Sequence, residues 1–307
     1  MKKIIITTLI ILIMPFKTSA LEIEKMYVDA EIEIGGGLNV KTLIKVSNNN
    51  EPLKYNIYLK DKSLKEFTGK QEDFEESLIY NATFAKLTKA GELKDEEYFN
   101  KLYESDFEKN VTFFEELKEE EQEKDDLKYH VITLNSEKKE TIYYLEYKVM
   151  NVLVEHTDSA EFYYKLFKNF NYDIKEIKIL THLPSKSELF KVWAHGNRDW
   201  KVNKDVGNQK VLLEKENFKK DEQIELRILY DKDIFAVNIN LDKKTNMEAL
   251  PIITKIEDAR LKNTNTQNLL KHSLVVLSTL LIVSIIAFII NKIIKKIKKT
   301  QKVKQKV

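Results

Sequence analysis

Residues 26–46 read MYVDAEIEIGGGLNVKTLIKV, with apolar and polar side chains alternating on both sides of three glycines. Alternation with a period of two is typical of a strand that buries one face and exposes the other. Because glycine adopts positive φ without steric cost, residues 35–37 predict the turn of a hairpin. A third alternating run, 55–59, predicts a third consecutive antiparallel strand.

The same alternation recurs along the chain and predicts the buried face of each strand. Further strands are expected within 140–156 and at 177–183, 211–213, 224–230 and 237–241. In the first hairpin, the side chains expected in the core are Val28, Ala30, Ile32, Ile34, Leu38, Val40, Thr42, Ile44 and Val46. The sequence therefore predicts a mainly β, antiparallel β-sandwich-like ectodomain, built as one domain or as two subdomains.

Two segments of this ectodomain are expected to be helical. The stretch of about 84–128 contains Glu and Lys at helical spacings, which predicts a charged, solvated helical insertion. Asp158 can cap a second, short helix, and Glu161 follows three residues later, as in a capping box. The apolar side chains that would form one face of this helix are Phe162, Leu166 and Phe170.

The two ends of the chain indicate a membrane protein. Residues 1–20 are basic, then apolar, then small, which is typical of a signal peptide. Residues 273–290 carry no charge, and as a helix they would span roughly 27 Å, so they predict a transmembrane helix. Residues 291–307 contain eight lysines and no acidic residue, which marks the cytoplasmic side. We expect a single-pass type I protein of the cell membrane, with an extracellular N-terminal domain.

Between these ends the sequence divides into three parts. Residues 21–155 form the N-terminal β subdomain that contains the charged insertion, and 156–242 form the second β subdomain. Residues 243–272 are polar and are expected to form a short helix and a stalk.

Charge and cysteine content exclude several classes of function. The whole chain has a formal net charge of +2, but eight lysines lie in the tail, so the ectodomain is acidic and does not suit nucleic acid. The tail suits the anionic lipids of the bilayer, and topology signalling explains it equally well. The absence of cysteine excludes disulfides and thiolate metal sites.

Motifs that carry catalysis are absent from the sequence. None of the five histidines stands in a metal-binding spacing, and the nucleotide-binding and serine-hydrolase fingerprints are missing. The sequence therefore predicts no catalytic residue, no metal site, no cofactor and no enzymatic activity.

The segment 193–200 is the best candidate for a contact site. It contains both tryptophans, and the candidate ligand or partner contacts are Trp193, His195, Arg198, Asp199 and Trp200. Exposed indole rings stack on sugars or anchor a protein partner, while Arg198 and Asp199 add directional hydrogen bonds. Alternatively, both indoles are core residues that flank a hairpin.

A series of motifs resembles one known family. The motifs are the tyrosine-rich strand 144–149, Asp158-Ser159-Ala160-Glu161, Leu183-Pro184 and Trp193-Ala194-His195-Gly196. Over roughly 22–270 the chain resembles bacterial predicted membrane proteins whose extracellular domain is classed as domain of unknown function 2207. Tyr164 and Thr42 depart from the common pattern of this family, and many of its members continue beyond the membrane into a long cytoplasmic part. The resemblance implies an architecture and a topology, and it brings no activity.

We therefore expect an extracellular β domain that binds or scaffolds at the bacterial cell surface. Its expected partners are the lipid bilayer and either an envelope protein or a cell-wall glycan. Two alternatives stay open: a subunit of an envelope membrane assembly, and a carboxylate-dependent cell-wall hydrolase.

Overall fold

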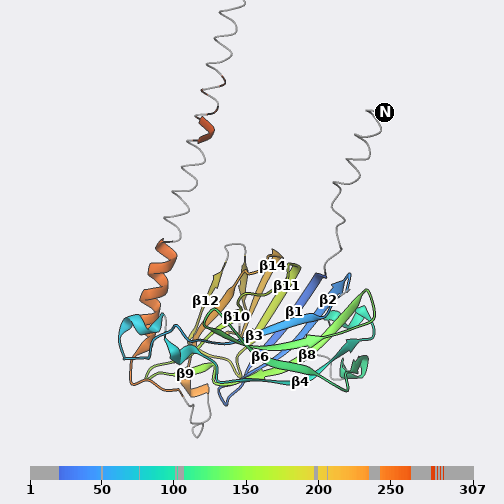
Figure 1. The fold of residues 1–307 in the computed structure, drawn as a ribbon. Helices are drawn as coiled ribbons and strands as arrows, with labels where there is room; N and C mark the ends of the chain where they lie inside the picture. Colours follow the sequence, from blue (N-terminus) through green and yellow to red (C-terminus); the bar gives the residue numbers. More distant parts are fainter. Residues whose placement is uncertain are drawn as a thin grey trace, which may run out of the picture. The chain divides into compact units, whose positions relative to one another are not determined.

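The computed structural model describes residues 21–49, 51–75, 77–100, 102, 107–196, 200–205, 207–234, 243–263, 278–280, 282, 284 and 286 (Figure 1). The chain divides into two units, 1–250 and 251–307. All of the strands described below belong to the first unit.

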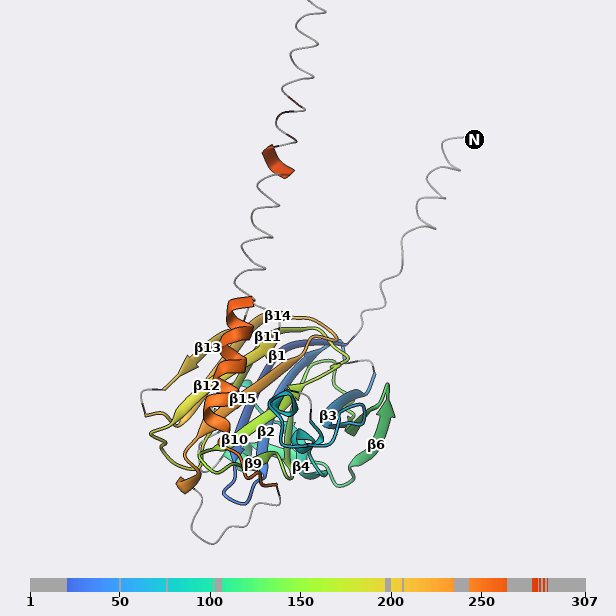
Figure 2. The same cartoon turned by 90° about the vertical axis from the view of Figure 1, so that its left-hand side faces the viewer.

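The strands form three sheets. An eight-stranded sheet, here called the large sheet, has the order β13-β14-β11-β1-β2-β8-β4-β5. Its strands are β1 (Glu22–Ile32), β2 (Leu38–Ser47), β4 (Ala85–Leu93), β5 (Val111–Phe113), β8 (Thr141–Val149), β11 (Ile174–His182), β13 (Lys201–Lys204) and β14 (Lys210–Phe218). Figure 2 shows β14, β11, β1 and β2 running side by side.

The two smaller sheets have four and three strands. The four-stranded sheet has the order β12-β15-β10-β9 and the three-stranded sheet β3-β7-β6. Their strands are β3 (Leu53–Asp61), β6 (Lys118–Lys124), β7 (Leu127–Leu134), β9 (Leu153–Glu155), β10 (Ala160–Phe167), β12 (Phe190–Gly196) and β15 (Ile224–Tyr230). Short 3₁₀ turns lie outside the strands of the three sheets: η1 (Gln71–Phe74), η2 (Leu78–Tyr80), η3 (Glu96–Asn100), η4 (Phe107–Asn110) and η5 (Lys232–Ile234).

The first hairpin confirms the alternation in the sequence. β1 pairs antiparallel with β2 up to Ile32 opposite Leu38, and Gly36 occupies the turn with φ of 86°. Of the nine side chains expected in the core, all but Ile34 are buried, and Ile34 is exposed because it lies in the loop beyond the last strand pair. One hydrophobic core includes side chains from all three sheets, so the smaller sheets cover one face of the large sheet.

Strands from both sides of residue 156 share the large sheet. β1 pairs parallel with β11, with Met26 opposite Ile177 and Ala30 opposite Thr181. The two predicted subdomains therefore contribute to one sheet.

The predicted three-stranded meander is wrong in its last strand. β3 pairs with β7 in the three-stranded sheet, while β8 takes the place beside β2. Alternation predicts that a strand exists, and it does not specify its neighbour.

The predicted helix after Asp158 is also wrong, because residues 160–167 form strand β10. β10 lies between β15 and β9, and most of its side chains on both faces are buried. Phe162 and Tyr164 point into the core, and Tyr163 on the opposite face is buried as well. A run of bulky aromatic side chains favours a pleated strand when both faces are covered.

The charged segment is not a helical insertion in its described part. Residues 118–124 form the exposed edge strand β6, which pairs with β7 through a tight turn at Asp125 and Asp126, both with positive φ. Charged side chains on an edge strand oppose unwanted pairing with other chains. The glutamates at helical spacing therefore serve a strand that is solvated on both faces.

Asp158 does cap a helix, but a different one. A helix occupies 249–263, within the stretch 243–272 where a short helix and a stalk are predicted. The Asp158 carboxylate accepts hydrogen bonds from the first backbone N–H groups of this helix, those of Ala249 (2.9 Å) and Leu250 (3.0 Å). The chemistry of an N-cap is present, supplied by a residue remote in sequence.

The predicted membrane elements lie largely beyond the described part of the chain. Residues 1–20 and 291–307 are outside it, as are most of 273–290 and all of the predicted strand at 237–241. Within the described residues, no helix is both long and apolar enough to cross a bilayer.

A fully buried ion pair joins the four-stranded sheet to distant segments. The Arg227 Nε of β15 donates to the Glu161 Oε1 of β10 at 2.6 Å, and neither side chain is exposed. The Arg227 Nη2 group donates to the Phe74 carbonyl oxygen at 2.6 Å, and the guanidinium lies 4.5 Å from the ring centroid of Tyr163.

The second oxygen of Glu161 is satisfied as well. Its Oε2 is 2.9 Å from the His156 Nε2 and accepts from the Tyr80 hydroxyl at 3.0 Å, while the His156 Nδ1 lies 2.6 Å from the Thr245 hydroxyl. Burial opposes ionisation of the carboxyl, but the Arg227 charge and the His156 hydrogen bond outweigh it and hold the pKa of Glu161 below its usual range. We call Glu161, Arg227, His156, Tyr80 and Thr245 the buried cluster.

Breaking the buried cluster on one side is expected to be costly. The substitution Glu161→Leu leaves the Arg227 charge buried without its counter-ion, so we expect a loss of about 3–5 kcal/mol in the free energy of unfolding by urea denaturation. The double variant Glu161→Leu/Arg227→Met removes both charges and should recover much of that loss. As a control, Lys89→Gln removes a half-exposed ion pair with Glu108 and should change stability by less than about 1 kcal/mol. Equal losses in Glu161→Leu and Lys89→Gln would contradict this account.

The lowered pKa of Glu161 also predicts a pH dependence of stability. A carboxyl whose pKa is lower in the folded chain stabilises the fold above its unfolded value of about 4.5, and this contribution is lost as the pH falls through the folded value. Urea midpoints measured from pH 7 to pH 3 should therefore fall less steeply below pH 4.5 in Glu161→Leu/Arg227→Met than in the native chain. Parallel profiles would show that another group dominates.

Candidate functional site

The segment 193–200 is divided between two sheets. Trp193 and His195 belong to β12 in the four-stranded sheet, and Trp200 immediately precedes β13 in the large sheet. Arg198 and Asp199 lie outside the described residues, so the structure places three of the five predicted contacts.

Trp200 packs against the core. Its ring centroid is 5.9 Å from that of Phe218 in a tilted, edge-on arrangement, and its indole nitrogen is buried. Trp200 thus matches the core interpretation of the sequence more closely than the contact interpretation.

Trp193 and His195 are half-buried on the opposite face of the four-stranded sheet from its core. Val192 and Ala194 of the same strand pack on the core, so the residues that alternate with them face away. Trp193 pairs in register with Arg227, and the His195 ring is 6.3 Å from that of Tyr163. These two predicted contacts therefore lie beside the buried cluster.

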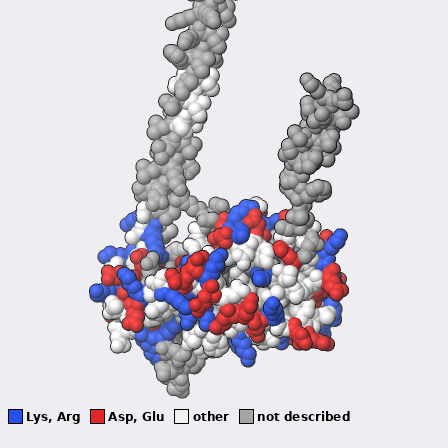
Figure 3. All heavy atoms as spheres, in the orientation of Figure 1, with Lys and Arg blue, Asp and Glu red and all other residues white. Residues whose placement is uncertain are grey.

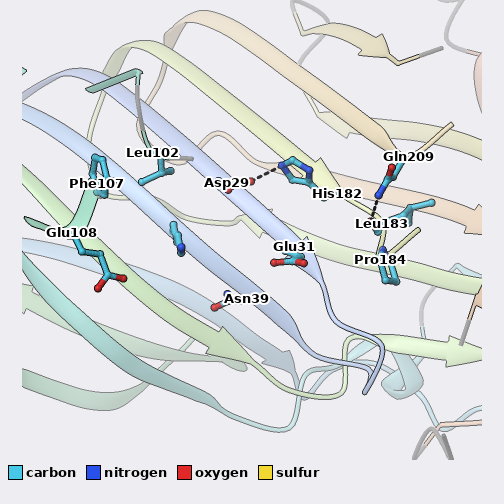
Figure 4. A pocket seen from close by; sticks show the side chains of 11 residues that line it. Asp29, Glu31, Asn39, Leu102, Phe107, Glu108, His182, Leu183, Pro184 and Gln209 are labelled. Carbon is cyan, nitrogen blue, oxygen red and sulfur yellow. Dashed lines mark hydrogen bonds and ion pairs between the residues drawn. The ribbon is translucent and has the colours of Figure 1, made fainter. Parts of the chain in front are cut away.

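The described residues form a groove on the other face of the large sheet. This groove has a volume of about 430 Å³. Its lining comprises Asp29, Glu31, Asn39, Lys41, Leu102, Phe107, Glu108, His182, Leu183, Pro184 and Gln209. Five of the polar side chains belong to neighbouring strands of the large sheet: Asp29 and Glu31 to β1, Asn39 and Lys41 to β2, and His182 to β11. Glu108 of η4 and Gln209, which precedes β14, complete the polar lining, and Figure 4 shows them at opposite ends of the groove.

The floor of the groove contains a contact between a histidine and a carboxylate. The His182 Nε2 is 2.7 Å from the Asp29 Oδ1, and both side chains are largely buried. This contact crosses from β11 to β1, the one parallel pair among the described strands of the large sheet (Figure 4). His182 is held away from His195, which lies in another sheet.

Apolar side chains border the groove on two sides. Leu102 and Phe107 belong to a small cluster that covers part of the outer face of the large sheet, with Phe107 5.6 Å from Tyr144 between ring centroids. Leu183 and Pro184 follow β11. The Leu183 backbone N–H donates to the Gln209 carbonyl oxygen at 2.8 Å, and the Gln209 side-chain amide donates to the Leu183 carbonyl oxygen at 3.2 Å. Both borders are thereby fixed.

Charges alternate across four strands beside the groove. Asp29, Lys41, Glu146 and Lys89 are successive register partners on β1, β2, β8 and β4. Lys89 also bonds Glu108 at 2.7 Å, and this hydrogen bond raises the pKa of Lys89. Opposite charges directly across a ladder stabilise a sheet. On the face drawn in Figure 3, basic and acidic side chains are likewise intermixed.

Sequence reasoning missed the groove, although its residues are visible in the sequence. Asp29, Glu31 and Lys41 are the polar half of the first hairpin, which alternation assigns only to a solvated face. No group of three or more His, Asp or Glu side chains with the geometry of a metal site occurs among the described residues.

The sequence matches a family model. The description "Predicted membrane protein (DUF2207) N-terminal domain" covers residues 22–230. The chain belongs to this family. The resemblance seen in the sequence motifs is thus confirmed, and the chain contains a domain of a predicted membrane protein whose function is unknown. No curated protein matches the sequence.

Three solved structures illustrate the distant likenesses of the DUF2207 chain. Yeast LTA4 hydrolase shares 6% identity at a TM-score of 0.40, covering 69% of this chain and 29% of its own. A putative protease from Parabacteroides distasonis shares 11% identity at 0.34, over 70% and 41%. An M1 zinc metallopeptidase from Deinococcus radiodurans shares 10% at 0.30, over 68% and 42%. The chain spans less than half the length of each, and likenesses this weak support no functional inference.

Gly196, the last residue of β12 and of the Trp-Ala-His-Gly motif, has a packing role. A Cβ placed on it would lie 2.5 Å from the Gln223 carbonyl oxygen and 3.4 Å from the Trp200 indole nitrogen. We expect Gly196→Ala to destabilise the DUF2207 domain by about 1–3 kcal/mol in urea denaturation, because backbone must move to admit the methyl group. In the control Gly35→Ala, the new methyl meets nothing within 4 Å, so stability should change by less than about 0.5 kcal/mol. Equal stability of the two variants would refute the packing role.

Proposed function

We propose that the DUF2207 domain is an extracellular binding module that captures a small ligand of the cell envelope in the groove beside His182. In this proposal the protein works by binding, with no catalytic step. The domain is carried by a single-pass type I membrane protein.

The groove is the observation that carries this proposal. Its volume of about 430 Å³ lies in the range of about 300–1,000 Å³ that is usual for small-molecule sites. It combines two apolar borders with a few charged groups, which is the composition by which such sites hold and orient a ligand. A rigid sheet under the groove favours recognition because little conformational entropy is lost on binding.

The contacts of two groove carboxylates, Asp29 and Glu108, favour binding over catalysis. Asp29 is held by His182 and Glu108 by Lys89. A carboxylate that is already engaged by a neighbouring side chain is a poor general base, whereas it gives a recognition site a fixed pattern of polar groups.

The sequence of the chain ends supports the topology. Residues 1–20 have the pattern of a signal peptide, 273–290 that of a membrane helix, and the lysines of 291–307 that of a cytoplasmic flank. With this orientation the groove would face the extracellular side, where an envelope ligand is available.

Filling the groove tests the proposed function. We expect fractions of envelope-derived small molecules to raise the melting temperature of the purified full chain, because a ligand at 100 times its Kd stabilises by about 2.7 kcal/mol. Gln209→Trp places an indole at the groove and should abolish the shift. The matched control Gln122→Trp alters the exposed edge strand β6 and should keep it. A shift that survives Gln209→Trp, or no shift with any fraction, would overturn the proposal.

A further inference from the structure

We propose that the groove binds a zwitterion, namely an amino acid or a short peptide with a free amino group and a free carboxylate. This inference rests on the proposed binding function and specifies its ligand. Glu31 receives the ammonium group of the ligand, and Lys41 receives its carboxylate.

Within the described part of the chain, Glu31 and Lys41 are the charged residues of the groove whose side chains have no ion-pair partner. Asp29 is paired with His182, and Glu108 is bonded by Lys89. Among the described residues, none forms an ion pair or a hydrogen bond with the side chain of Glu31 or Lys41. Two opposite charges in one cavity are therefore available to a ligand.

The register of the first hairpin places these charges at a useful spacing. Glu31 lies opposite Asn39, and Lys41 lies opposite Asp29. Glu31 of β1 and Lys41 of β2 are thus diagonal neighbours on one face of an antiparallel strand pair. Residues in this relation are about 7–8 Å apart across the two strands. A ligand that carries both charges a few bonds apart can bridge them.

The mixed charge of the lining discriminates between ligand classes. A ligand with only negative charge, such as a phosphate, would meet Lys41 but also the unpaired carboxylate of Glu31. A ligand with only positive charge could pair with Glu31 but would be repelled by the ammonium group of Lys41. A zwitterion can pair with both Glu31 and Lys41. A ligand with a single charge would leave one of these two residues unpaired beside it, which is unfavourable.

The apolar borders fit the remaining part of such a ligand. Leu102 and Phe107 stand on one side and Leu183 and Pro184 on the other, beside the charged floor (Figure 4). The side chain of an apolar amino acid would be covered between them. The volume of about 430 Å³ limits the ligand to a few residues.

Paired changes in ligand and protein test the charge assignment. The probe is the dipeptide alanyl-leucine, compared with its C-terminal amide and its N-acetyl derivative by calorimetric titration of the full chain. We expect the amide and the N-acetyl derivative each to bind about tenfold or more weakly than the free dipeptide, because each loses one charged hydrogen bond.

The variants identify which residue reads which end. The Lys41→Gln variant should bind the free dipeptide about tenfold more weakly than the native chain does, and it should bind the dipeptide and its amide with equal affinity. The Glu31→Gln variant should likewise bind the free dipeptide about tenfold more weakly, and it should bind the dipeptide and its N-acetyl derivative with equal affinity. Lys45→Gln is the matched control on β2, because Lys45 is paired with Glu24 and Glu96 and does not line the groove; its affinities should equal those of the native chain. Unchanged melting temperatures check that the variants fold.

The source of the peptide is separated by chirality. Preference for the D,D form of the dipeptide points to a cell-wall peptide, and preference for the L,L form points to a peptide derived from protein. Equal affinity for the dipeptide and its blocked derivatives would overturn the zwitterion proposal, as would native affinity in Lys41→Gln and Glu31→Gln. If no dipeptide binds while an envelope fraction still gives a shift that Gln209→Trp abolishes, the ligand class is wrong and the binding function stands.

Discussion

The ionised Glu161 carboxylate, buried between Arg227 and His156, is the constraint on which much of this fold depends. An ion without exposure to water must have every hydrogen bond supplied by protein. Its partners are Tyr80 of the 3₁₀ turn η2, Arg227 of β15 and His156 of the connection between β9 and β10. His156 in turn contacts the Thr245 hydroxyl. Segments as far apart in the sequence as Tyr80 and Thr245, 165 residues, are therefore fixed around the Glu161 side chain. The free-energy cost of a buried carboxylate without hydrogen bonds exceeds the conformational entropy lost in ordering any one of these segments.

The outer faces of the four-stranded sheet and the large sheet are covered by different segments. The four-stranded sheet has its outer face closed over by the segment containing Phe74 and Tyr80, which contact Arg227. The large sheet is covered on its outer face by a separate apolar cluster that reaches only part of the way. That cluster comprises Leu43, Leu93, Phe99, Leu102, Phe107, Val111, Ile142 and Tyr144. The groove begins where this cover ends, at β1, β2 and β11.

The sequence predicted the hairpin from 26–46 because burial of one face is a local property of alternation, and the register follows from the short glycine turn. It did not predict β10, since Phe162, Leu166 and Phe170 fit a helix equally well until β15 and β9 enclose the strand. Asp158 shows the same limit: its capping chemistry is legible, and the helix that it caps is 91 residues away. One usable signal was overlooked. Arg227 stands inside IELRILY, an apolar run in a chain with three arginines, and a charge in such a run indicates a buried partner.

The candidate site escaped prediction for a related reason, because it is defined by which charges lack a partner. Across the large sheet, Asp29, Lys41, Glu146 and Lys89 alternate in sign, and a regular ladder would satisfy each charge on both sides. The two carboxylates on either side of Lys41 also have other contacts. Glu146 accepts a hydrogen bond from the Tyr144 hydroxyl at 3.0 Å and lies 3.7 Å from Lys89, while Asp29 turns to His182 on the parallel neighbour β11. Lys41 lies in register between these two carboxylates and is the cation that we propose as the contact for the ligand's carboxylate. The parallel pairing of β1 with β11, which brings His182 beside Asp29, therefore contributes to leaving Lys41 available in the proposed site.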